Sequence, residues 1–293
     1  MTEKVRDLRT ALKVLKAKGE LLETDKEVDP HAELAGVYRY VGAAGTVMRP
    51  TKIGPAMLFN KVKGHEDARV VIGVVGSRKR VSLMLDVPEE RLGFALNEAV
   101  QNPIEPRIIP NEGALCQEVK YFADEPGFDI RKLIPAPTNT PEDAGPYITM
   151  GMCYASDPET GESDITIHRL CLQSKDEISM YFVPGARHLG VFREKAEKAG
   201  KPLPISISIG VDPAISIASC FEPPTTPLGF NELTIAGGLR NEAVELTKCL
   251  TIDENCIANA EYVIEGFLMP DQRVREDQNT GTGKAMPEFP GYT

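Results

Sequence analysis

The feature that most constrains this chain is a proline-rich stretch over residues 102–146, because proline interrupts helices and central strands alike. It includes Asn102-Pro103 and Ile134-Pro135-Ala136-Pro137 and carries little helical periodicity. Before it, apolar residues recur at helical spacing; after it, short runs separated by turn residues are typical of strands. We therefore predict an α/β domain over residues 1–105 and a β-rich domain over residues 106–293.

Local patterns predict the elements of each domain. In the first domain we expect a buried strand over residues 70–75 and helices that begin near Val5, after Asp29 and after Asp86. In the second we expect a helix over residues 189–199 and strands over residues 107–109, 118–122, 147–154, 164–173, 178–183, 204–209 and 260–268. Such a chain belongs to the α/β or α+β class.

Charge and cysteine content limit the partners and the compartment. Of the 293 residues, 33 are basic and 43 are acidic, and the formal charge of −10 argues against binding to a nucleic-acid backbone. No stretch reaches the roughly 18 apolar residues of a membrane span, and the first residues lack the apolar core of a signal peptide. Six dispersed cysteines without a Cys-x-x-Cys pair predict reduced thiols. We expect a cytoplasmic protein that acts on a small molecule, with neither nucleic acid nor membrane as partner.

The four histidines differ in their surroundings. His31 and His65 lie at a capped helix start and in a polar loop, which favours structural or solvated roles. His168 lies in the β-rich half, close to other candidate site residues. His188 begins a predicted helix, where backbone N–H groups gather, so it is either a ligand or acid/base group or a helix-start histidine in water.

Two charged residues of the second domain stay open on residue patterns alone. Arg169 interrupts an apolar strand, and it lies either at an exposed edge or buried against carboxylates, because an unpaired buried charge is very costly. Glu232 has the pattern of a solvated charge at a strand start. No P-loop, dinucleotide fingerprint, nucleophile elbow or His-Glu-x-x-His motif is present. Residue chemistry alone therefore predicts an enzyme with a His/Asp/Glu/Arg site in its second half.

Several phrases together resemble one family, the UbiD family of prenylated-FMN-dependent decarboxylases. They resemble most the branch that acts on hydroxylated benzoic acids such as gallate, protocatechuate, 4-hydroxybenzoate and vanillate. The phrases occur in family order along the whole chain: Ala35-Gly36-Val37-Tyr38-Arg39-Tyr40, Thr138-Asn139-Thr140-Pro141-Glu142-Asp143-Ala144-Gly145-Pro146, Pro223-Pro224-Thr225-Thr226-Pro227, Ala236-Gly237-Gly238-Leu239-Arg240 and Pro287-Glu288-Phe289-Pro290-Gly291-Tyr292. The resemblance implies a split β-barrel flavin-binding domain over residues 106–293.

The resemblance also implies a metal site and a cofactor site. A divalent metal, Mn²⁺ or Mg²⁺, with K⁺ as a further candidate, and the flavin phosphate would be held by Asp164, His188 and Glu232. Asp164 stands where many members have Asn, and a hard cation accepts oxygen from either side chain. The implied prenylated-FMN contacts are Asp164, Ile165, Thr166, Ile167, His168, Arg169, Arg187, His188 and Glu232.

The catalytic set that the resemblance implies is Arg169, Glu276 and Glu288. Arg169 would hold the substrate carboxylate, and Glu276 would orient Arg169. The flavin would act as an electron sink for a reversible, non-oxidative decarboxylation. Glu288 would return a proton to the ring carbon, which requires a carboxylic acid with a raised pKa.

Strand geometry adds one expectation about this site. Asp164 and Arg169 are five residues apart, so on a regular strand their side chains face opposite sides. We therefore predict a bulge or similar irregularity between them, because both would otherwise not reach one cofactor.

Members of the family continue past the position of Tyr292 into a C-terminal domain, which supplies a further flavin-phosphate contact and much of an oligomer interface. The resemblance thus implies a chain without that domain, a flavin prenyltransferase as cofactor supplier, a small aromatic acid as substrate, and a homo-oligomer at full length. A catalytically incomplete chain that binds flavin phosphate or a partner without turnover is the alternative. A flavin reductase on a similar barrel is a third, although nothing resembles a nicotinamide site.

Overall fold

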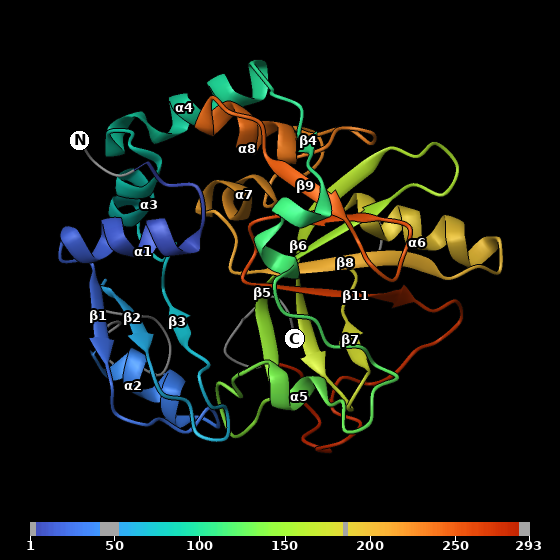
Figure 1. The fold of residues 1–293 in the computed structure, drawn as a ribbon, viewed down its shortest axis with the longest axis horizontal. Helices are drawn as coiled ribbons and strands as arrows, with labels where there is room; N and C mark the ends of the chain where they lie inside the picture. Colours follow the sequence, from blue (N-terminus) through green and yellow to red (C-terminus); the bar gives the residue numbers. More distant parts are fainter. Residues whose placement is uncertain (1–3, 42–52, 184–186, 287–293) are drawn as a thin grey trace.

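The computed structural model describes residues 4–41, 53–183 and 187–286, and its elements fall into two groups along the chain (Figure 1). The first group contains α1 (Leu8–Ala17), β1 (Leu21–Thr24), α2 (Glu33–Val41), β2 (Ala56–Phe59), β3 (Val70–Ile72), α3 (Arg78–Leu85) and α4 (Leu92–Gln101). The second contains β4 (Arg107–Ile108), α5 (Ile130–Leu133), β5 (Tyr147–Ser156), β6 (Ser163–Leu172), β7 (Ile178–Met180), α6 (His188–Lys198), β8 (Leu203–Ile209), α7 (Pro213–Ala218), α8 (Leu233–Arg240), β9 (Glu245–Lys248), β10 (Asn255–Ile257) and β11 (Tyr262–Leu268).

Three sheets organise these elements. In the first group, β1 runs parallel to β2, and β3 pairs antiparallel with β2. In the second group, five antiparallel strands in the order β11-β8-β5-β6-β7 form the main sheet, which curls on itself (Figure 1). A third sheet has the order β10-β9-β4. The mixed helix and sheet content and the curled antiparallel sheet confirm the predicted fold class. No helix within the described ranges is both long and apolar enough to cross a membrane.

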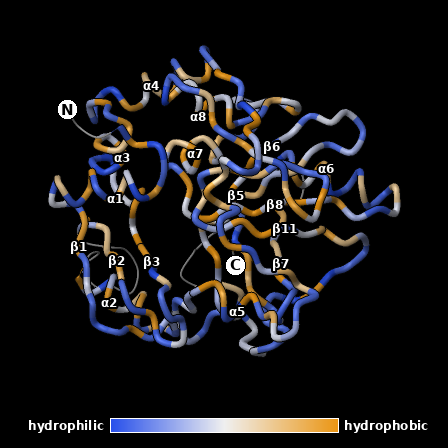
Figure 2. The backbone as a smooth tube through the Cα atoms, viewed as in Figure 1, coloured by the Kyte–Doolittle hydropathy of each residue, from blue (hydrophilic) through white to orange (hydrophobic). Residues whose placement is uncertain are grey.

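The main sheet is covered on both faces, and its strands are largely hydrophobic (Figure 2). On one face, Met152 and Ile165 pack in a cluster with residues of α4, α7 and α8. On the other face, Leu170 packs with Phe192 of α6. Each fully buried large apolar side chain contributes about 1.5–3 kcal/mol. Polar side chains on such a sheet must therefore find partners inside the protein.

Some predicted boundaries in the first group are wrong. Asp86 does not begin a helix; it ends α3 in a left-handed conformation with φ of 55°. The helix after Asp29 begins only at Glu33, because Ala32 has a left-handed backbone with φ of 64°, which a right-handed helix does not contain. The strand predicted over 70–75 stops at Ile72, where Gly73 follows with φ of 80°.

In the second group, β5, β6, β7 and β8 confirm the strands predicted over 147–154, 164–173, 178–183 and 204–209, although β7 ends at Met180. Residues 118–122 form no strand. Helix α8 and strands β9 and β10 were not predicted. Their segments are short and mix glycine or polar residues with apolar ones, so they lack a clear period.

Helix α8 approaches α4 and the chain that follows it through two glycines. A Cβ atom on Gly237 would lie 2.5 Å from the carbonyl oxygen of Ile104, and one on Gly238 would lie 2.9 Å from that of Ala99. Backbone atoms cannot rotate away as a flexible side chain can. The close approach therefore depends on the absence of a side chain.

We expect Gly237→Ala to lower the free energy of unfolding by about 1–3 kcal/mol, because the added methyl group overpacks this contact. Gly93→Ala in α4 is the matched control: a Cβ there meets nothing within 4 Å, so the better helix propensity of alanine should leave stability unchanged or raise it by up to about 1 kcal/mol. Urea unfolding of the two variants measures both effects. Equal stability of the two would contradict the packing argument.

Candidate metal centre and charged cavity

Three secondary elements bring Asp164, His188 and Glu232 together. Asp164 lies near the start of β6, His188 is the first residue of α6, and Glu232 directly precedes α8. One ligand atom from each residue lies within 4.8 Å of the others, and all three side chains are buried. The His188 Nδ1 atom lies 3.4 Å from Asp164 Oδ1 and 3.9 Å from Glu232 Oε1. The prediction that Glu232 is a solvated charge at a strand start is therefore wrong.

The donor atoms of this cluster fit a divalent cation. Asp164 Oδ2, His188 Nε2 and Glu232 Oε2 are buried and have no hydrogen-bond partner among the described residues. Buried polar atoms without partners are costly, and two carboxylates with one imidazole form a ligand set that suits a divalent cation.

The pKa values of His188 and Glu232 reflect how close the ionisable groups of this cluster lie to one another. The hydrogen bond to Asp164 raises the pKa of His188 above its ordinary value. Burial, together with the neighbouring Asp164, raises the pKa of the Glu232 carboxyl. Both shifts reduce the net negative charge that the cluster holds in the absence of a cation.

Arg187 directly precedes His188 and lines the small hollow beside this cluster. Its guanidinium donates to Thr166 Oγ1 (2.7 Å) and to the Ser219 carbonyl (3.3 Å), and it pairs with Glu222 at 2.5 Å. Its backbone has φ of 66°, a region that costs a non-glycine residue about 1–3 kcal/mol. The polar contacts offset this cost. They hold the positively charged guanidinium of Arg187 directly before the N-terminus of α6, beside the metal-ligand candidates.

His168 projects from β6 on the same face as Asp164 and Thr166. Its Nδ1 lies 3.1 Å from the Tyr181 carbonyl, which can only accept, so Nδ1 carries the proton. Burial lowers the pKa of His168 to about 4. Its Nε2 is buried and unpartnered within the described structure, so His168 presents a neutral hydrogen-bond acceptor.

Arg169 lies on the opposite face of β6 and is buried against a carboxylate. Its Nε and Nη2 atoms donate to the two oxygens of Glu276 at 3.0 and 2.7 Å. The guanidinium carbon also lies 4.5 Å from the centre of the Tyr181 ring. Of the two alternatives for Arg169, the structure therefore selects the buried, paired one, with only 10% of its side chain exposed.

The predicted irregularity between Asp164 and Arg169 is wrong in its position. The ladder between β6 and β5 is regular from Ser163 to His168. The bulge lies in β5 instead, where Thr149 and Met150 both oppose Arg169. Asp164 and Arg169 consequently face opposite sides of the strand, and the structure forms two clusters rather than one. This arrangement counts against a shared site built on side chains of β6 alone.

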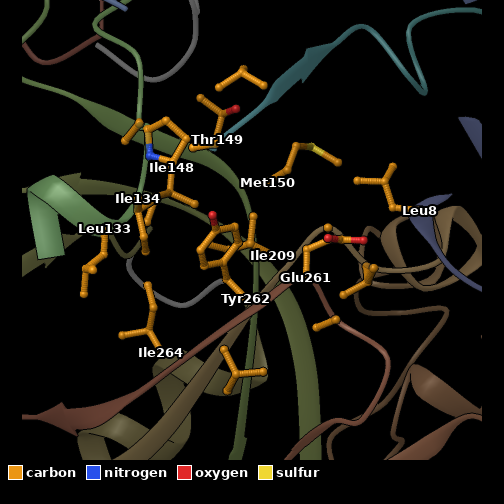
Figure 3. A pocket seen from close by; sticks show the side chains of 18 of the residues that line it. Leu8, Leu133, Ile134, Ile148, Thr149, Met150, Ile209, Glu261, Tyr262 and Ile264 are labelled. Carbon is orange, nitrogen blue, oxygen red and sulfur yellow. The ribbon is translucent and has the colours of Figure 1, made fainter. Parts of the chain in front are cut away.

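A large cavity borders the second cluster. It encloses about 2250 Å³ between the two groups of elements, more than the roughly 300–1,000 Å³ of a typical ligand pocket. Figure 3 shows part of its apolar wall, formed by Ile148 and Met150 of β5 together with Tyr262 and Ile264 of β11. Arg169, His168 and Arg187 also line this cavity. Arg187 borders in addition the small hollow beside Asp164, His188 and Glu232, so it lies where a ligand could extend from one cluster to the other.

The remaining predicted site residues differ in accessibility. The Ile165 side chain is fully buried in the core, whereas Ile167 lines the cavity. Glu288 lies outside the described residues. The sequence analysis missed Tyr181, whose ring contacts Arg169, and Gln173, which bonds to the Glu276 carbonyl. Neither residue stands in a recognisable motif.

Comparison with known proteins identifies the family. The model of the 3-octaprenyl-4-hydroxybenzoate carboxy-lyase Rift-related domain matches residues 107–293, and the model of the N-terminal domain of the same carboxy-lyase matches residues 12–100. The chain belongs to the UbiD family. The predicted resemblance is thereby confirmed.

The UbiD relatives include enzymes of known activity. The chain is 55% identical to a gallate decarboxylase of Lactiplantibacillus plantarum, over all of this chain and 60% of that protein. An apo 3,4-dihydroxybenzoic acid decarboxylase of Klebsiella pneumoniae superposes with a TM-score of 0.92 at 54% identity, covering 98% of this chain and 59% of that one. A dimeric form of the UbiD-class enzyme HmfF from Pelotomaculum thermopropionicum, in complex with prFMN, has a TM-score of 0.81 at 38% identity, covering 91% of this chain and 58% of that one. The chain thus spans about three fifths of the length of these relatives.

We expect Mn²⁺ to raise the melting temperature of the chain through His188. A ligand that binds only the folded state stabilises it by about 2.7 kcal/mol at a hundredfold excess over Kd. His188→Ala should abolish the shift, whereas His31→Ala, at an exposed histidine, should retain it. Thermal unfolding with increasing Mn²⁺ measures the response. A shift that survives in His188→Ala would place the ion elsewhere.

We also expect His168 to make stability depend on pH. Because its pKa in the folded protein, about 4, is below the ordinary value of 6.5, the unfolded chain binds the proton more tightly. The stabilisation is complete above pH 6.5 and is lost as pH falls toward 4, by about 2 kcal/mol between pH 7 and pH 5. His168→Asn, which can still donate to the Tyr181 carbonyl, should lack this component, and His31→Asn should keep it. Urea unfolding at both pH values provides the test.

Proposed function

We propose that this chain carries the cofactor-binding and catalytic residues of a non-oxidative decarboxylase. The reaction would release CO₂ reversibly from a hydroxylated benzoic acid of the gallate, protocatechuate or 4-hydroxybenzoate type. The observation that carries the proposal is the bidentate Arg169–Glu276 pair at the wall of the large cavity. The activities of the gallate and 3,4-dihydroxybenzoic acid decarboxylases among the relatives support it.

Different residues of this chain would perform the different steps of the decarboxylation. Arg169 holds the substrate carboxylate by charge-assisted hydrogen bonds, and Glu276 fixes the orientation of the guanidinium. The apolar wall of the cavity excludes water from the aromatic ring. Glu288 delivers a proton to the ring carbon once CO₂ has left, and in the reverse direction it removes that proton.

The cofactor in this proposal is prenylated FMN, which supplies, when bound, a sink for the electrons left on the ring. Asp164, His188 and Glu232 hold a divalent metal, Mn²⁺ or Mg²⁺, with K⁺ as a further candidate. Arg187 and His168 offer a cation and a neutral acceptor to the flavin phosphate and its polar chain. The unpartnered donor atoms of the cluster support this assignment, as does the prFMN complex of the relative HmfF.

For domain organisation, cofactor supply, assembly and location, we follow what is expected of the family. We infer a domain boundary near residue 105, which the break between the two matching family models supports. A flavin prenyltransferase would supply the cofactor, the full-length protein would be a homo-oligomer, and the reaction would take place in the cytoplasm.

The test is to co-express the chain with a flavin prenyltransferase, record the absorbance spectrum of the purified protein, and measure CO₂ release from protocatechuate and gallate. We expect bound modified flavin and turnover that Glu288→Gln abolishes, because the proton donor is lost. Bound flavin without turnover would favour the alternative of a catalytically incomplete chain. A colourless protein would contradict the proposal that these residues suffice to bind the cofactor.

A further inference from the structure

Gln173 connects the end of β6 to the segment that carries Glu276. It directly follows β6, lies on the same face of the strand as Arg169, and is 6% exposed. Its Nε2 donates to the backbone carbonyl of Glu276 at 2.9 Å. Gln173 therefore holds the backbone of Glu276, while Arg169 holds its carboxylate.

All four hydrogen-bonding positions of the Gln173 amide are in use. Nε2 donates its second proton to Ser179 Oγ at 2.7 Å. Oε1 accepts from Gln278 Nε2 at 3.2 Å and from Asn279 Nδ2 at 3.0 Å. A buried amide with two donors and two acceptor sites filled has one defined orientation. The side chain is thus a rigid connector between β6, β7 and residues 276–279.

The segment from 275 to 284 has a stable shape of its own but few other attachments near Glu276. The Asp277 carboxylate pairs with Arg275 and accepts the N–H of Gly283 at 2.8 Å. Thr280 Oγ1 donates to the Ala144 carbonyl at 2.9 Å and attaches the far side of the loop. Next to Glu276, the Gln173 side chain holds the Glu276 carbonyl, and Asn279 Nδ2 also donates to the backbone carbonyl of Gln173 at 2.7 Å.

We propose that Gln173 is a positioning residue for the decarboxylase site: it holds the backbone of Glu276 so that the carboxylate meets Arg169 in bidentate geometry. This inference rests on the proposed function, since it assigns Arg169 to the substrate carboxylate. Gln173 itself touches neither substrate nor cofactor; it acts through Glu276.

Two substitutions separate this role from general stabilisation. Gln173→Glu keeps the shape and the acceptor oxygen, so the bonds from Gln278 and Asn279 can persist, and the Ser179 hydroxyl can donate to the new oxygen where it accepts from Nε2 in the wild type. The substitution replaces the donor to the Glu276 carbonyl by a second oxygen. Gln173→Met removes all four bonds without adding charge. Gln278→Ala is the matched control, because it removes one bond to Gln173 and leaves the link to Glu276 intact.

The first readout needs no turnover. Arginine-specific labelling with phenylglyoxal, followed by peptide mass spectrometry, reports how well Glu276 shields Arg169. We expect Gln173→Glu and Gln173→Met to raise the labelling rate of Arg169 severalfold, toward that of Glu276→Gln, and Gln278→Ala to leave it at the wild-type rate. An unchanged rate in both Gln173 variants would overturn the proposal, even if the wild-type chain has no activity.

The second readout is kcat/KM of the cofactor-loaded chain. Misplacement of a catalytic group by about 1 Å costs up to about 100-fold, and we expect a 10- to 100-fold loss in Gln173→Met. Because Gln173 acts through Glu276, the double variant Gln173→Met/Glu276→Gln should be no slower than Glu276→Gln alone. If the losses of the two single variants instead multiply in the double variant, the role of Gln173 is merely structural. Absence of turnover in the wild type would count against the proposed function, and the labelling result would still decide the role of Gln173.

Discussion

Strand β6 carries ionisable side chains into the interior on both of its faces, and each of them needs a partner from elsewhere in the chain. Asp164 meets His188 and Glu232 on one face, and Arg169 meets Glu276 on the other. The partners come from the starts of α6 and α8 and from the segment after β11. The charges of this one strand thus constrain where three distant segments of the chain lie, because an unpaired buried charge is very costly.

The two clusters differ in how complete they are. Arg169 and Glu276 satisfy each other through two charge-assisted bonds, and Gln173 fixes the backbone behind them. In the cluster of Asp164, each residue keeps one buried atom without a partner among the described residues. The Arg169–Glu276 pair has both of its charges paired and can orient a ligand. The Asp164 cluster is a set of donor atoms that a bound cation would complete.

Local signals predicted those elements whose stability is local. Helix α1 begins after Asp7, whose side chain accepts the N–H of Thr10, and ends before Gly19. Strands β5 and β6 follow runs that are rich in apolar residues. The errors lie where tertiary contacts override such signals. Asp86 has the residue type of a helix start, yet it ends α3, and Glu232 has the type of a surface charge, yet it is 2% exposed. The bulge opposite Arg169 lies in β5 directly before Gly151, a residue type that often marks a bulge inside a strand.

The fold class, the family and the candidate charged residues could be read from the amino-acid sequence, because periodicity, turn chemistry and motif phrases are properties of neighbours along the chain. Only the tertiary structure decided which charges are buried and which of them meet. It placed Asp164 and Arg169 on opposite faces of a regular strand, set Arg187 beside both clusters, and made Gln173 the support of Glu276. Pairing and burial depend on contacts between segments that are far apart in the sequence, as the Arg169–Glu276 separation of 107 residues shows.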